Sequence, residues 1–205
     1  MRIVLVAIAL LVAVAAQAQH AFAIDTISDA LMQRMKGKSM PEGCTIRRSQ
    51  LRHITLLHYD LEGRVRQGEI VCNRLIANDL LNIFRLLYEQ RYPIESVRLI
   101  DDFDADDERS MQANNTSCFC YRTVAGSKKL SKHAQGMAID INPLYNPCVK
   151  GRRVQPANAR EYADRNKKFR CKITTHDLCY QLFIQHGFKW GGAWNSLKDY
   201  QHFEK

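Results

Sequence analysis

The sequence has no Cys-x-x-Cys pair, no internal repeat, no low-complexity tract and no linker in its 205 residues. The missing cysteine pairs argue against a cysteine zinc knuckle and a thioredoxin-type redox centre. No nucleic-acid-binding motif is present, so we expect no nucleic acid partner. Apolar residues make up 46% of the chain and charged residues 25%. This ordinary globular composition excludes wholesale disorder and a fibrous repeat.

The N-terminus has the pattern of a secretory signal peptide. A basic start, Met1-Arg2, precedes an apolar run from Ile3 to Ala16, and Ala16-Gln17-Ala18 fits a small-x-small cleavage site. Ala21-Phe22-Ala23 is a second option for cleavage. An uncleaved anchor is the alternative, but the run is short for a span of about 20 residues. We predict a signal peptide over residues 1–18 and an exported, periplasmic or extracellular protein without a membrane span after cleavage.

The exported part carries all the cysteines and an excess of positive charge. An oxidising compartment favours disulfides, although seven cysteines leave at least one outside any intramolecular pair, and the sequence does not assign the pairing. The formal charge is +9, which suits an anionic partner. The basic stretch 152–172 could meet an anionic polymer of the cell wall or could be a solvated face.

Hydrophobic periodicity predicts one α+β domain. The patterns place helices over 24–36 and 77–88 and a third starting near Thr174, a hairpin over 51–72, strands at 97–100 and 119–124, an acidic loop over 101–115, and a tail of strand, Gly-rich turn and strand over 188–204.

Two segments carry the residues that indicate chemistry. In 131–143, SKHAQGMAIDINP, His133 precedes Asp140 by seven residues, and this Asp interrupts an apolar run. A carboxylate there is costly to bury unless a partner pairs with it, such as a metal ion or, in the simpler reading, an arginine or a turn. In 190–204, Asp199 precedes His202 by three residues. For both to reach one site, we expect Asp199 in the turn before the strand that holds His202.

His133, Asp140 and His202 together fit a three-ligand zinc site with one open position for water. Zinc lowers the pKa of that water to about 7, which gives a hydroxide nucleophile at neutral pH. Asp199 could take a proton and pass it to a leaving amine. This composition favours a hydrolytic site over a structural one.

The sequence resembles the VanY-type zinc D-Ala-D-Ala carboxypeptidases and the phage L-alanyl-D-glutamate endopeptidases, which share a fold group with hedgehog-like zinc domains. The resemblance runs from about Arg98 to Glu204, and its motifs are at 114–117, 119–122, 131–147 and 190–204. It implies a central, mainly antiparallel sheet that carries the zinc site and is flanked by helices. Residues 93–205 would form the peptidase core, and residues 19–92 would complete the same domain.

The resemblance also implies roles for single residues. His133, Asp140 and His202 would bind one zinc ion per chain, and Asp199 would be the general base, with Glu204 as the alternative. Many relatives have Glu at the base position, so Asp199 departs from their pattern. Arg122 would face the substrate, or it would form a structural ion pair. Ser131 would be the motif serine, or it would only fix the loop.

We therefore expect a secreted zinc metallopeptidase that cuts peptidoglycan stem peptides by zinc-hydroxide attack, most simply a D-Ala-D-Ala carboxypeptidase. An endopeptidase acting on the same stem is one alternative. A zinc-stabilised domain that binds cell wall or protein without cutting is another, and the presence of Asp199 favours catalysis over it. A disulfide-rich domain with incidental histidines is a third. The oligomeric state stays open.

Overall fold

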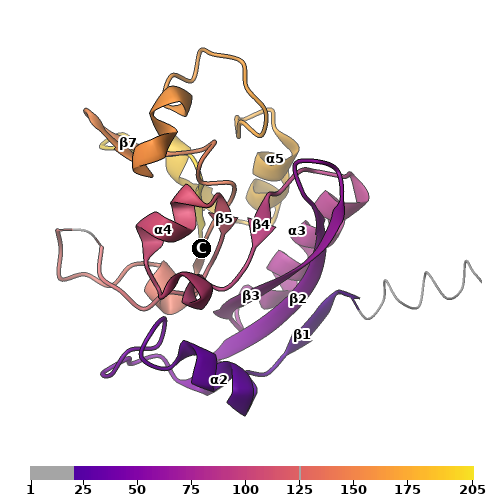
Figure 1. Cartoon of the computed structure of the whole chain (residues 1–205), viewed down its shortest axis with the longest axis vertical. Helices are drawn as coiled ribbons and strands as arrows, with labels where there is room; N and C mark the ends of the chain where they lie inside the picture. Colours follow the sequence, from indigo (N-terminus) through magenta and orange to yellow (C-terminus); the bar gives the residue numbers. More distant parts are fainter. Residues whose placement is uncertain (1–20, 125) are drawn as a thin grey trace, which may run out of the picture.

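The protein is described here by a computed structural model covering residues 21–124 and 126–205 (Figure 1). The predicted signal peptide, 1–18, lies outside the described residues. No helix in the described part of the chain is both long and apolar enough to cross a membrane.

An antiparallel sheet forms the N-terminal part of the fold, in the order β1-β2-β3 (Figure 1). Its strands are β1 (Ala23–Asp25), β2 (Leu51–Tyr59) and β3 (Val65–Asn73). The turn between β2 and β3 is closed by Asp60, whose carboxylate accepts the N–H groups of Glu62 and Arg64 at 3.0 and 2.9 Å. This satisfies turn amides that have no strand partner, and the predicted hairpin is confirmed.

Two helices belong to this part of the fold. The helix α3 (Ala77–Glu89) packs against β1 and β2 through a buried apolar face, as its periodicity predicts. The helix α2 (Asp29–Met35) is shorter than the predicted 24–36, because 23–25 pairs with β2 as β1. Ser28 caps α2 by accepting the N–H of Leu31 at 3.2 Å.

The C-terminal part holds a second antiparallel sheet, in the order β6-β11-β9. Its strands are β6 (Ala138–Asp140), β11 (His202–Glu204) and β9 (Lys189–Trp190), and His202 lies opposite Asp140 in the register. The helix α5 (Leu178–Gln185) begins at its cap Asp177 rather than near Thr174. Phe183 of α5 stacks on Phe203 of β11 with ring centroids 4.3 Å apart, which fixes the helix on the sheet.

The remaining elements are short. They are the sheet β10 (Lys198–Asp199), β7 (Cys148–Lys150) and β8 (Arg153–Gln155), the parallel pair β4 (Ser96–Val97) and β5 (Asn115–Thr116), and the 3-10 helices η1 (Arg48–Gln50), η2 (Ile100–Phe103), η3 (His133–Gln135), η4 (Ala157–Tyr162) and η5 (Gly191–Ala193). One hydrophobic core includes Ile54, Phe84, Ile139 and Phe203, so both parts form one domain. The α+β class is confirmed, with the strands divided among several small sheets.

Further expectations differ from the structure. The strand expected at 97–100 is reduced to β4, Ser96–Val97, and Ile100 already begins η2. The acidic stretch 101–115 is not a loop, because it contains most of η2 and the helix α4 (Asp107–Gln112), capped by Asp106. Residues 119–124 form no strand and contribute only an isolated bridge between Thr123 and Leu130. All seven cysteines are free, so the expected disulfides find no support, and four of these thiols are buried.

Candidate metal centre

Three buried side chains from three elements meet at one point. His133 comes from η3, Asp140 from the end of β6 and His202 from the start of β11. His202 Nδ1 lies 3.1 Å from both His133 Nε2 and Asp140 Oδ1, and His133 Nε2 lies 3.3 Å from Asp140 Oδ1. The structure therefore brings together the predicted ligands.

The outer nitrogen of each imidazole has its own hydrogen-bond partner. His133 Nδ1 donates to the carbonyl of Cys118 at 2.7 Å, and His202 Nε2 donates to Glu204 Oε2 at 3.2 Å. These bonds leave the inner nitrogens as acceptors that face the carboxylate of Asp140. With both imidazoles neutral, three acceptors converge, and a cation, either a proton or a metal ion, is needed between them.

The pKa values of His202 and Asp140 also show that a positive charge between the three side chains would be stabilised. Burial works against the charged form of His202, yet its hydrogen bonds to Asp140 and Glu204 raise its pKa to about 10. Burial likewise opposes ionisation of Asp140, but the charge and hydrogen bond of His133, with the hydrogen bond of His202, hold the pKa of this carboxyl well below its ordinary value. A proton or a metal ion satisfies this group of residues.

The separations of the three atoms fit a small tetrahedral ion. Ligand bonds of about 2.0–2.1 Å at tetrahedral angles separate neighbouring ligand atoms by about 3.3–3.4 Å. The three observed separations are 3.1, 3.1 and 3.3 Å. The residues present therefore fit a metal ion held by two imidazoles and one carboxylate.

The loop that carries His133 is fixed from both sides. Gly136 has a φ of +66°, and a Cβ at this position would lie 2.6 Å from the backbone nitrogen of Asn73, so only glycine fits. Ser131 Oγ accepts the N–H of His133 at 3.1 Å. The hydroxyl of Ser131 is thus engaged in holding the first ligand.

Asp199 lies next to this group on another sheet. It ends β10 and pairs with Cys148 of β7, so it is not in the turn where we expected it. Its Oδ1 is buried and has no hydrogen-bond partner among the described residues. Burial raises the pKa of Asp199 to about 6, which suits a group that exchanges protons near neutral pH.

Residues 125–205 match a family model described as D-alanyl-D-alanine carboxypeptidase. We call them the carboxypeptidase-like segment. The match confirms the resemblance over this part of the chain, and it contains His133, Asp140, Asp199 and His202 but not Arg122. No curated protein and no solved structure matches the chain.

Arg122 lies just before the carboxypeptidase-like segment and is tied to it. Its carbonyl accepts the N–H of Ser131 at 3.0 Å. Its Nε forms an ion pair with Asp107 of α4. The structural ion pair therefore exists, and its partner lies in a stretch for which the sequence predicts only a loop.

The two tryptophans of the carboxypeptidase-like segment have different positions. Trp190 is buried, and its Nε1 donates to the carbonyl of Tyr200 at 2.9 Å, so it belongs to the core. Trp194 is half-buried, and its ring centroid lies 5.2 Å from that of His202. Trp194 thus forms part of the wall around the metal centre.

The basic stretch 152–172 is not uniformly solvated. Arg165 donates to the carbonyls of Tyr145 and Ile173, both at 2.8 Å, and its guanidinium lies 4.3 Å from the ring centroid of Tyr200. This arginine ties the segment after η4 to Tyr145, Ile173 and Tyr200, so its guanidinium is already engaged within the fold.

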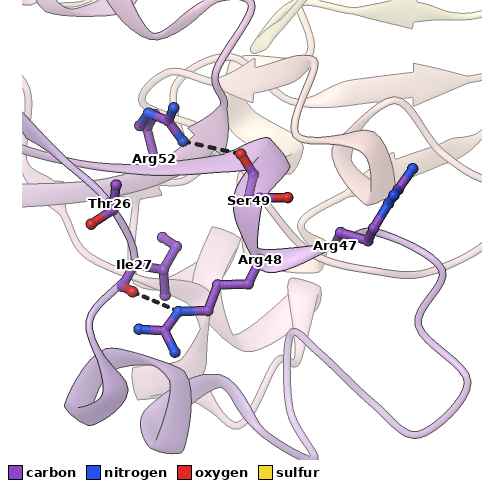
Figure 2. A pocket seen from close by; sticks show the side chains of 6 residues that line it. All are labelled: Thr26, Ile27, Arg47, Arg48, Ser49 and Arg52. Carbon is purple, nitrogen blue, oxygen red and sulfur yellow. Dashed lines mark hydrogen bonds between the residues drawn. The ribbon is translucent and has the colours of Figure 1, made fainter.

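An open hollow of about 480 Å³ lies apart from these residues, beside β1 and η1 (Figure 2). Figure 2 shows the guanidinium of Arg48 bonded to the carbonyl of Ile27 and that of Arg52 bonded to the carbonyl of Ser49. The lining residues are Thr26, Ile27, Arg47, Arg48, Ser49 and Arg52. The lining holds no carboxylate or imidazole, and none of its residues belongs to the candidate metal centre.

Proposed function

We propose that the protein is an exported zinc metallopeptidase that hydrolyses peptidoglycan stem peptides, as a D-Ala-D-Ala carboxypeptidase. The observation that carries the proposal is the convergence of three acceptors, His133, Asp140 and His202, inside the segment that matches a carboxypeptidase family. Two imidazoles and one carboxylate are typical of catalytic zinc sites, which keep a fourth position open.

The surrounding residues would keep the metal site rigid. The Cys118 carbonyl and the Glu204 carboxylate fix the tautomers of His133 and His202. This use of Glu204 favours Asp199 as the general base. A bound zinc ion would supply Lewis acidity, which makes water nucleophilic near neutral pH and polarises a carbonyl.

Asp199 would move the proton. In its ionised form, the buried and unpartnered Oδ1 accepts a proton from the attacking water. The protonated carboxyl then donates it to the amine that leaves, and the base is regenerated. We propose that Arg122 holds the terminal carboxylate of the stem peptide and that Ser131 positions His133 without touching the substrate.

Export completes the proposal, because the substrate lies outside the cytoplasmic membrane. We propose cleavage after Ala18 rather than after Ala23. Phe22 is buried in the core and its ring lies 5.6 Å from that of Tyr88, and Ala23 starts β1. Cleavage after Ala23 would remove Phe22 from the core and Ala23 from β1.

Two matched variants test the assignment of the base. Asp199→Ala should abolish release of the terminal residue and leave one equivalent of zinc bound, because Asp199 is not a ligand. Glu204→Ala should weaken zinc binding, since His202 loses its partner, and should keep measurable turnover at saturating zinc. Zinc content by mass spectrometry and product release by chromatography give both quantities. If Asp199→Ala stays active while zinc-saturated Glu204→Ala is dead, Glu204 is the base.

A further inference from the structure

Asp107 differs from the other carboxylates of its segment in the partner that it contacts. Its neighbours pair with groups that lie outside the metal centre: Asp101 accepts the N–H of Ser39, Asp102 pairs with Arg98 and Arg34, Asp104 pairs with Lys38 and Arg109, and Glu108 accepts the N–H of Ala157. Asp107 instead pairs with Arg122, the arginine whose carbonyl bonds Ser131.

The pair lies close to the metal centre and is partly shielded from water. The side chains of Asp107 and Arg122 are 28% and 34% exposed. Burial raises the pKa of Asp107, and the charges of Arg122, His133 and Asp140 all act on the same carboxyl. Asp107 thus lies within the electrostatic reach of two of the candidate ligands.

The geometry of the guanidinium explains what such a pair can do. Arginine presents five N–H donors in a rigid planar fork. The carboxylate of Asp107 contacts Nε as an ion pair without a hydrogen bond from the Nε–H, and Arg122 makes no other ion pair within 21–124 and 126–205. The terminal nitrogens therefore remain available for a second carboxylate.

We propose that Asp107 is a positioning residue that holds the guanidinium of Arg122 in the orientation that receives the substrate carboxylate. The proposal rests on the proposed function, since it assigns the element that places the carboxylate of a stem peptide at the metal centre. The helix α4, which Asp106 caps by accepting the N–H of Arg109 at 3.1 Å, would then carry one residue of the substrate site.

A double-mutant cycle tests the action through Arg122. Asp107→Asn keeps the shape and removes the charge, and it should lower kcat/KM on a pentapeptide stem about 10- to 100-fold, mainly through KM, because a misplaced binding group costs this much. Arg122→Lys should change the same parameter, and Asp107→Asn should add nothing in that background. Asp107→Glu should recover part of the loss. Zinc content and melting temperature should stay at wild-type values.

Asp106→Asn is the matched control. It removes the same charge one residue away, and asparagine caps a helix as well as aspartate does. This variant should keep its KM. Independent, additive effects of Asp107→Asn and Arg122→Lys, or a KM unchanged by Asp107→Asn, would overturn the proposal.

A second measurement separates this proposal from the proposed function. The ¹⁵N resonance of Arg122 Nε, observed in the zinc-loaded protein, should have the position of an ion-paired guanidinium, and it should move in Asp107→Asn and stay in Asp106→Asn. If the wild-type protein shows this signal but no turnover, only the proposed function fails. If turnover is present and the signal does not depend on Asp107, only the role of Asp107 fails.

Discussion

The backbone of Gly191 packs directly against Asp199 and His202 of the candidate site. Only a residue without a side chain can lie this close to them. A Cβ at this position would lie 2.9 Å from Asp199 Cβ, 3.2 Å from His202 Cβ and 2.7 Å from the Asp199 carbonyl oxygen. Glycine at position 191 is therefore required by the close approach of its backbone to Asp199 and His202.

Gly191→Ala should shift Asp199 away from its position and lower kcat. A displacement near 1 Å costs about 100-fold in rate. Steady-state kinetics at saturating zinc measure the loss, and Ala193→Ser, at an exposed neighbouring position, is the control that should stay active. Wild-type kcat in Gly191→Ala would show that the spacing of Asp199 and His202 is not critical.

At the same scale, the three candidate ligands could be selected from the sequence, and the structure brings them together, whereas the groups that orient them could not be predicted. His133, Asp140 and His202 are chemically distinctive and lie in short motifs. The carbonyl of Cys118 carries no sequence signal, because every residue has a carbonyl. Asp107 is one of several acidic residues in 101–115, and the sequence does not distinguish it from the others. Only the fold shows that it is the one that contacts Arg122.

At the scale of elements, α2, β2 and β3 are joined by one carboxylate. Glu69 on β3 bonds His53 Nε2 on β2 at 2.9 Å and Arg34 Nη2 on α2 at 2.6 Å. The hydrogen bond of His53, with the hydrogen bond and charge of Arg34, lowers the pKa of Glu69 from 4.5 to about 2. Since the folded pKa lies below the unfolded one, the contribution to stability is complete above pH 4.5 and disappears as the pH falls toward 2.

Glu69→Gln should therefore lower the free energy of unfolding by about 1 kcal/mol at pH 7 and by much less near pH 2.5. Urea unfolding of the metal-free protein at both pH values checks this, and Glu62→Gln, in an exposed surface pair, is the control. An equal loss at both pH values would mean that the ionised carboxylate is not the source of the stability.

The elements with strong patterns were predictable, and those set by tertiary contacts were not. The alternation of apolar and polar residues in 51–72 predicts β2 and β3, and the apolar face of 77–88 predicts α3. The observed ends of these elements differ from the predicted ends by one or two residues at most. The polar 101–115 has no apolar period, yet α4 forms there because Asp106 caps it and Ser110 and Met111 are buried. The segment 119–124 is rich in apolar residues, but its backbone hydrogen bonds go mostly to loops and not to a neighbouring strand. Its composition therefore predicted a strand that does not form.

At the scale of the whole molecule, the candidate metal centre joins separate parts of the chain. Its candidate ligands come from η3, β6 and β11, and the loop of η3 also bonds β3 through Asn73, whose N–H donates to the carbonyl of Gly136 at 2.8 Å. A metal that binds only the folded protein stabilises all of these contacts together.

Zinc should therefore raise the melting temperature of the metal-free protein, with a stabilisation of about 4 kcal/mol at a thousand times Kd. Differential scanning calorimetry measures the shift, and magnesium is the control ion, since it prefers six oxygen ligands. His133→Ala should lose most of the shift. An unchanged melting temperature with zinc would argue that no metal site is formed.

The most direct test of the account is digestion of a defined muropeptide with a pentapeptide stem, read by mass spectrometry. The zinc-loaded protein should release one terminal alanine, a chelator should abolish the release, and added zinc should restore it. A metal-dependent cut inside the stem would keep the peptidase and change it to an endopeptidase. No cleavage by the zinc-loaded protein, or cleavage that the chelator does not affect, would contradict the account.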